Sequence, residues 1–162
     1  MRVFQLSLME LVNTYVAHHT LPLGYEEVTC LFDSIHKGYP IGQLVFQEKE
    51  IIDGRKRIQA LSEYLLDPYD SNNFRIDYYF SRGEFLVVDK TTELSNRQMR
   101  VCDLMDTHNF LPGIHQLTEV NKEKANSLAN KFHNYRVNCV ELDGLTNSQI
   151  ALLRLRLHGK NS

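Results

Sequence analysis

Residues 51–61 read Ile-Ile-Asp-Gly-Arg-Lys-Arg-Ile-Gln-Ala-Leu, a pattern typical of a buried strand, a glycine turn and the start of a helix. The first turn of a helix carries backbone N–H groups without intrahelical partners, at the positive end of the helix dipole. Arg55, Lys56 and Arg57 add three cations at that end, where each costs a few tenths to about 1 kcal/mol. A bound anion reverses the sign of that cost. The segment therefore predicts a phosphate site formed by Gly54 and the three cations.

Asp53 stands directly before the glycine of this turn. A carboxylate beside a bound phosphate can hold a divalent cation such as Mg²⁺, or it can orient an attacking water molecule. Asp53 is therefore the candidate catalytic and metal-binding residue. The residues alone leave a second interpretation open, in which the turn is a solvated basic surface and Asp53 is the N-cap of the helix.

A second informative segment, residues 32–42, reads Phe-Asp-Ser-Ile-His-Lys-Gly-Tyr-Pro-Ile-Gly. By itself it predicts the end of a helix, closed by a glycine cap and a proline that prevents continuation. Ser34 has no histidine at the spacing of a catalytic pair, so we do not assign it as a nucleophile. Close to a phosphate, its hydroxyl group would act as a hydrogen-bond donor.

The composition is that of an ordinary globular protein. The chain has 162 residues, of which 43% are hydrophobic and 23% charged. This length predicts one domain, residues 1–162, with a core of its own. The formal net charge of -2 argues against a generally basic nucleic-acid binder but leaves room for a local basic patch.

The cysteines and the apolar segments predict a cytoplasmic protein. Cys30, Cys102 and Cys139 include no CxxC pair, so we expect three reduced thiols that pack as small hydrophobes. No window reaches the roughly 18 apolar residues of a membrane span, and the N-terminus lacks a signal-peptide pattern. His18 and His19 are adjacent, so on a helix they point about 100° apart and do not suit one metal ion.

Apolar periodicity predicts an α+β fold in which a small sheet and a β-hairpin are surrounded by helices. Helices are expected at residues 6–18, 25–37, 57–66, 96–106, 118–134 and 146–157, strands at residues 42–47, 50–52, 74–80, 84–89 and 135–142, and a loop at residues 107–116.

Taken together, residues 31–42 and 51–61 resemble the GmrS-type domain, a ParB-like domain of unknown function found in GmrSD-type restriction systems and related anti-phage proteins. Its signature is a helix ending in D-S-I-x-x-G-x-P-I, followed by a strand ending in I-D-G-Q-Q-R and a helix. The hairpin at residues 75–85 and the closing strand and helix from residue 135 extend the resemblance to about residues 25–158.

This resemblance implies a single ParB/sulfiredoxin-like domain with a small mixed sheet. In the family the D-G-x-x-R motif supports nucleotide binding and hydrolysis, and Asp53, Gly54 and Arg57 match it directly. Arg55 and Lys56 replace two glutamines. Residues 1–24 are expected to form a divergent N-terminal helix and loop, without the family's Q-R-x-Y-x-W segment.

Two features near the C-terminus also depart from the family. The R-x-N-x-G-G pattern is only partly present at residues 156–159, and we expect no C-terminal nuclease domain of the kind usual in the family.

The leading hypothesis is a nucleotide-binding domain with weak Mg²⁺-dependent nucleoside-triphosphatase activity, in a phage-defence or mobile-element context. Asp53 serves the metal or the water, and Gly54, Arg55, Lys56, Arg57 and Ser34 hold phosphate. A separate nuclease or defence subunit is the expected protein partner. Two alternatives stay open: a non-catalytic ParB-like module whose basic turn meets DNA phosphates, and a protein-interaction module with a decayed site.

Overall fold

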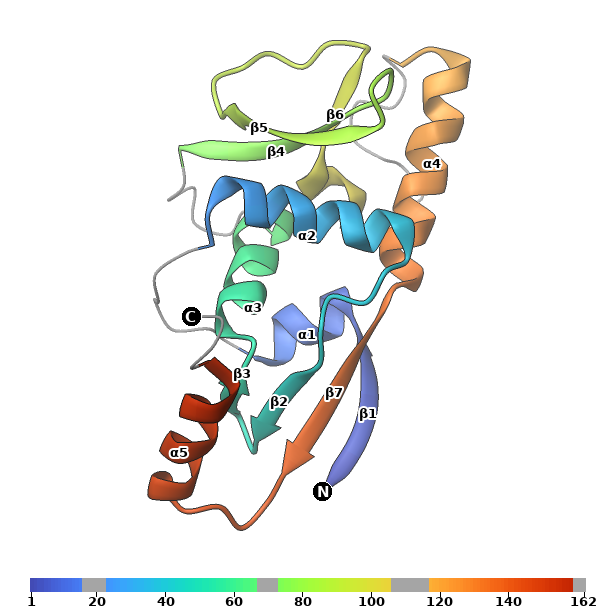
Figure 1. The fold of residues 1–162 in the computed structure, drawn as a ribbon. Coiled ribbons are helices and arrows are strands. Elements are labelled where there is room, and N and C mark those ends of the chain that lie inside the picture. Colours follow the sequence, from blue (N-terminus) through green and yellow to red (C-terminus); the bar gives the residue numbers. More distant parts are fainter. Residues whose placement is uncertain (16–22, 67–72, 106–116, 159–162) are drawn as a thin grey trace.

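The computed structural model describes residues 1–15, 23–66, 73–105 and 117–158, and it confirms the α+β class (Figure 1). Its elements, in chain order, are β1 (Arg2–Ser7), α1 (Leu8–Thr14), α2 (Tyr25–Lys37), β2 (Leu44–Gln47), β3 (Glu50–Asp53), α3 (Arg55–Leu61), the π-helix η1 (Ser62–Leu66), β4 (Phe74–Tyr79), β5 (Glu84–Asp89), β6 (Gln98–Arg100), the 3₁₀ helix η2 (Val101–Met105), α4 (Glu119–Asn134), β7 (Arg136–Leu142) and α5 (Asn147–His158).

One sheet has the strand order β1-β7-β2-β3. Strand β7 lies inside it, antiparallel to β1 and parallel to β2, while β2 and β3 pair antiparallel. Cys139 of β7 stands opposite Phe4 on one side and Leu44 on the other, and it is fully buried. Burial raises the pKa of its thiol to about 11. Cys139 is thus the inert hydrophobe expected, whereas Cys30 is exposed and does not fit that expectation.

The second sheet has the order β5-β4-β6 and is antiparallel throughout. Figure 1 shows α2 between this sheet and the sheet that contains β7. Phe32 of α2 is fully buried and packs on Phe85 of β5 and Phe132 of α4, with ring centroids 6.2 and 6.1 Å apart. Burying such aromatic rings contributes roughly 1.5–3 kcal/mol each, so α2 is the element that joins the two halves of the core.

The N-terminal helix expected at residues 6–18 is wrong in its first part. Residues 2–7 form β1, and α1 begins at Leu8 because Ser7 and Glu10 make a reciprocal capping box. The pairing of β1 with β7 overrides the helical spacing of the apolar residues. His18 and His19 lie outside the described residues.

The helix expected at residues 96–106 is also wrong. Residues 98–100 form the edge strand β6 against β4, and the chain then turns through η2. Arg100 donates to the carboxylate of Asp103 at 2.9 and 3.1 Å, which fixes this short turn.

The helix expected from Arg57 begins two residues earlier, at Arg55, and changes to π geometry from Ser62. The loop expected at residues 107–116 lies outside the described residues.

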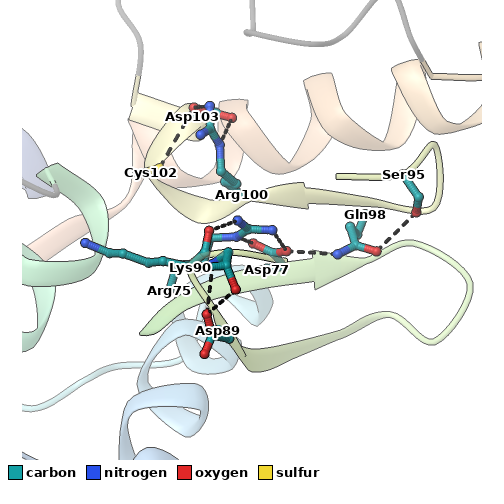
Figure 2. A network of polar contacts seen from close by, with 10 residues as sticks. Arg75, Asp77, Asp89, Lys90, Ser95, Gln98, Arg100, Cys102 and Asp103 are labelled. Carbon is teal, nitrogen blue, oxygen red and sulfur yellow. Dashed lines mark hydrogen bonds and ion pairs between the residues drawn. The ribbon is translucent and has the colours of Figure 1, made fainter. Parts of the chain in front are cut away.

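A polar network ties the second sheet together (Figure 2). Asp77 is completely buried in β4 and accepts hydrogen bonds from Arg75 at 2.9 and 3.0 Å and from Gln98 at 3.0 Å. Gln98 in turn accepts from Ser95, and Arg75 also donates to the carbonyl of Lys90. A carboxylate buried this deeply is tolerated only because charged and amide donors surround it.

We therefore expect Asp77→Ala to lower the free energy of unfolding by about 3–5 kcal/mol, since it leaves the guanidinium of Arg75, whose side chain is 12% exposed, without its anion. Urea denaturation measures this loss. The control is Glu84→Ala, which breaks the exposed Arg82–Glu84 pair and should change stability by about 1 kcal/mol or less. Similar losses in the two variants would contradict the role given to the buried pair.

Candidate functional site

The turn after β3 is built as the sequence predicts. Ile51 and Ile52 are buried and deliver the chain to Gly54, which caps α3 with a left-handed φ of 109°. The N–H of Ile58 donates to the carbonyl of Gly54 at 2.9 Å, so the N–H groups of residues 55–57 are those without intrahelical acceptors. Because Gly54 and not Asp53 is the N-cap, the interpretation of Asp53 as the cap is wrong.

A cleft of about 1080 Å³ opens at this turn. Its walls come from α2, the loop that follows α2, the β3–α3 turn and α5. The lining residues are Leu23, Glu26, Glu27, Cys30, Leu31, Ser34, Pro40, Ile41, Ile52, Asp53, Gly54, Arg55, Lys56, Arg57, Arg154 and Leu157. The structure thus brings all the predicted site residues to one cleft, including Ser34 from the other motif.

Arg57 connects the two motifs directly. Its Nη1 donates to the carbonyl of Ile41 at 2.8 Å, and its Nη2 donates to the carbonyl of Gln43 at 3.4 Å. Its Nη2 also lies 3.5 Å from the carboxylate of Asp53, and both side chains are about four-fifths buried. Burial lowers the pKa of Arg57, and the negative charge of Asp53 acts in the opposite direction. Arg57 is therefore a positioning residue for the loop after α2, a role the sequence did not reveal.

Two glycines make room for this arrangement. Gly42 has a φ of 93°, and a Cβ atom there would collide with Nη1 of Arg57. Gly54 has a φ of 109°, and a Cβ atom there would collide with Cδ2 of the buried Leu44. At both positions the left-handed backbone and the close neighbour each demand a residue without a side chain.

The remaining cations of the cleft differ in exposure. Lys56 is exposed, whereas Arg55 is half-buried and its Nε donates to the carbonyl of Ile51 at 3.3 Å. Arg154 of α5 also lines the cleft, which the sequence analysis missed. The signal was present, because Arg154 follows Leu153 on the face of α5 that carries the buried Ile150. Arg156, the residue singled out by the resemblance, is exposed and does not line the cleft.

The carboxylates of the cleft are divided between two elements. Glu26 and Glu27 belong to α2, and Asp53 is the last residue of β3. Within the described ranges, no three Asp, Glu, His or Cys side chains gather as a metal site would require. A single carboxylate still suits Mg²⁺ that arrives with a nucleotide, since phosphates and water then supply most of its ligands. Asp53 fits that arrangement.

The family model of the GmrSD restriction endonuclease N-terminal domain matches residues 24–155, which include both motifs and most of α5. The chain belongs to this family. The GmrSD family is one of restriction enzymes, so the restriction and phage-defence context expected from the resemblance is confirmed at that level. A search of the curated proteins gave no match.

The assignment to the GmrSD N-terminal family leaves several finer points as predictions: nucleotide binding, hydrolysis, DNA contact and the relation to ParB. One finding bears on the membrane: no helix in the described part of the chain has the length and hydropathy to cross a bilayer.

The fit of Arg57 against Gly42 can be tested through stability. We expect Gly42→Ala to be more destabilising than Gly144→Ala, although both glycines have a positive φ, 93° and 71°. The alanine at position 144 meets only backbone strain, about 1 kcal/mol, because nothing lies within 4 Å of its Cβ. The alanine at position 42 also displaces the Arg57 guanidinium from its acceptor, which adds about 1–3 kcal/mol. Chemical denaturation measures the free energy of unfolding of both variants. Equal losses would contradict the close fit of the Arg57 guanidinium against Gly42.

Proposed function

We propose that the cleft binds a nucleoside triphosphate together with Mg²⁺ and hydrolyses it slowly, as part of a restriction or phage-defence system. The observation that supports this most is the meeting of the α3 N-terminus with Arg55, Lys56 and Arg57 in one cleft that also holds the other family motif. Such a site offers both backbone donors and charge to a phosphate.

The cations have different tasks in this proposal. Backbone N–H groups of residues 55–57 cradle one phosphate, and Lys56 and Arg55 neutralise it from the cleft wall. Arg57 is already engaged with two carbonyls and a carboxylate, so it contributes charge and holds the loop after α2 in place. The hydroxyl of Ser34 donates a hydrogen bond from α2.

Asp53 is the residue proposed for turnover. Mg²⁺, when bound, would offset phosphate charge and polarise the phosphorus–oxygen bonds. Asp53 would hold the metal or accept the proton of the attacking water. Its contact with Arg57 fixes the carboxylate at the end of β3, beside the N–H groups that hold the phosphate.

A small anion suits this cleft better than a DNA backbone. Glu26 and Glu27 on the α2 wall would repel a continuous line of phosphates, and the net charge of -2 gives no long-range attraction to DNA. A nucleotide with its metal can place phosphates against the basic wall alone. We propose that DNA contact and cleavage belong to a partner nuclease, in keeping with the endonuclease named in the family.

Lys56 provides the cleanest test of phosphate binding, because it is exposed and its removal leaves the Arg57 contacts in place. We expect Lys56→Ala to weaken ATP or GTP binding by about 1 kcal/mol, roughly fivefold, through loss of a charge-assisted hydrogen bond. Isothermal titration calorimetry with Mg²⁺ measures the affinity.

Lys49→Ala is the matched control, since Lys49 is an exposed lysine in the β2–β3 turn and does not line the cleft. It should leave the affinity unchanged. Equal effects of the two variants would indicate a diffuse attraction and would refute the site. Tighter binding of duplex DNA than of nucleotides would favour the ParB-like alternative.

Asp53→Asn should separate binding from turnover. We expect the nucleotide affinity to change by less than about threefold and the hydrolysis rate to fall by about 100-fold or more, because an amide neither accepts the proton nor holds Mg²⁺ well. Phosphate release and calorimetry give the two values. Glu123→Gln, an exposed carboxylate of α4, is the control and should be silent. If affinity and rate fell in parallel, Asp53 would have no separate role in turnover and would act only as the ion-pair partner of Arg57.

A further inference from the structure

The two edges of the sheet that contains β7 differ in how their backbone groups are used. At the β3 edge, the carbonyl of Ile51 accepts hydrogen bonds from Arg154 of α5 at 2.8 Å and from Arg55 at 3.3 Å. Arg154 also pairs with Glu50 at 3.1 Å, so α5 is fastened along this edge. Side chains that occupy edge carbonyls hinder the pairing of another strand there. The β3 edge is therefore closed within the chain itself.

The β1 edge carries no such protection. Strand β1 pairs with β7 along its whole length without a shift in register, and Figure 1 shows it at the outer margin of the sheet. In an antiparallel pair about half of the backbone N–H and C=O groups of a strand face the neighbour, so the other half of those in β1 point outward. Among the described residues, no hydrogen bond from a side chain or a loop reaches the backbone of residues 2–5. These groups form an open row of donors and acceptors.

The side chains of β1 also leave the edge open to a second strand. The strand contains no proline, glycine or lysine, the residues with which exposed edges are commonly protected. Its single charged residue, Arg2, is folded back, since its guanidinium lies 4.5 Å from the centre of the Phe4 ring and 3.2 Å from the carboxylate of Glu141. Val3, an apolar β-branched residue, is 66% exposed. The edge is thus regular, partly apolar and without an uncompensated charge.

We propose that β1 pairs antiparallel with β1 of a second copy of this chain about a twofold axis, so that the two four-stranded sheets join into one. An axis perpendicular to the sheet brings residues of the same face opposite each other. An axis at Phe4 pairs the whole strand: Phe4 faces its own copy, and Val3 faces the partner's Gln5. Directly opposed aromatic rings are among the favourable cross-strand pairs.

A second copy of the chain is the occupant that this edge fits. Pairing about a twofold axis uses each β1 edge once, and the β3 edges at the two ends of the joined sheet are closed by Arg154, so the assembly ends at two chains. Pairing adds no like-charge contact, because Glu141 compensates Arg2 in each copy. The candidate cleft lies at the β3 end of the sheet, so pairing through β1 leaves both clefts open and does not depend on nucleotide binding.

Sedimentation velocity of the whole chain over a concentration series tests this pairing. One strand pair is a small interface, so we expect a monomer–dimer equilibrium in the micromolar range. Val3→Lys together with Gln5→Lys places like charges opposite each other and should raise the dissociation constant about tenfold or more. Val3→Lys together with Gln5→Glu places opposite charges at the same two contacts and should retain or strengthen the dimer. Val3 and Gln5 are exposed in the single chain, so both variants should fold, which melting curves check.

The matched control is Val120→Lys together with Leu152→Lys, which adds the same two charges at exposed apolar positions of α4 and α5. It should leave the dissociation constant unchanged. A loss equal to that of the like-charge β1 variant would show that added charge, and not the β1 edge, governs association, and it would refute the proposal.

Three other results would also overturn it. The first is a wild-type chain that stays monomeric throughout the series, and the second is a mass that keeps growing beyond two chains, because the closed pair leaves no free edge. The third is equal weakening by the two β1 variants, since pairing about Phe4 requires that opposite charges at positions 3 and 5 attract.

Discussion

The contact on which the candidate site depends is the insertion of the Arg57 guanidinium into the loop after α2. The carbonyls of Ile41 and Gln43 accept its hydrogen bonds, so the start of α3 and the end of the α2 motif form one wall. The hydroxyl of Tyr135 holds the same loop from its other end by donating to the carbonyl of Tyr39 at 2.6 Å. A loop fixed at both ends loses little further entropy when it binds a ligand.

The fold could be predicted from the sequence wherever a short segment contains local signals, such as helix caps and an apolar face. Helix α2 has a glycine at each end, acidic residues in its first turn and one apolar face, and its predicted bounds are confirmed. Residues 2–7 and 98–100 carry no such local signal. Both became edge strands because a distant partner, β7 or β4, offered unpaired backbone groups. Pairing of that kind depends on tertiary structure, so helical spacing was misleading there.

The same distinction applies to the site. The turn proposed to bind phosphate is local, so the residues from Asp53 to Arg57 could be proposed from spacing and charge, and the resemblance linked them to Ser34. The contribution of Arg154 is not local, because α5 reaches the cleft only after β7 has returned beside β2 and α5 has packed on β3. The hydrogen bonds from Arg57 to backbone carbonyls could not be predicted either. Every residue has a carbonyl oxygen, so no sequence pattern indicates which ones accept.

The distribution of charge in the cleft argues for a ligand of mixed character. Cations occupy the wall made by the β3–α3 turn and α5, while Glu26 and Glu27 stand on α2. A bare phosphate chain would be attracted by one wall and repelled by the other, whereas a phosphate chain that carries Mg²⁺ presents both signs of charge. The arrangement therefore favours the metal complex of a nucleotide over either a free polyanion or a duplex.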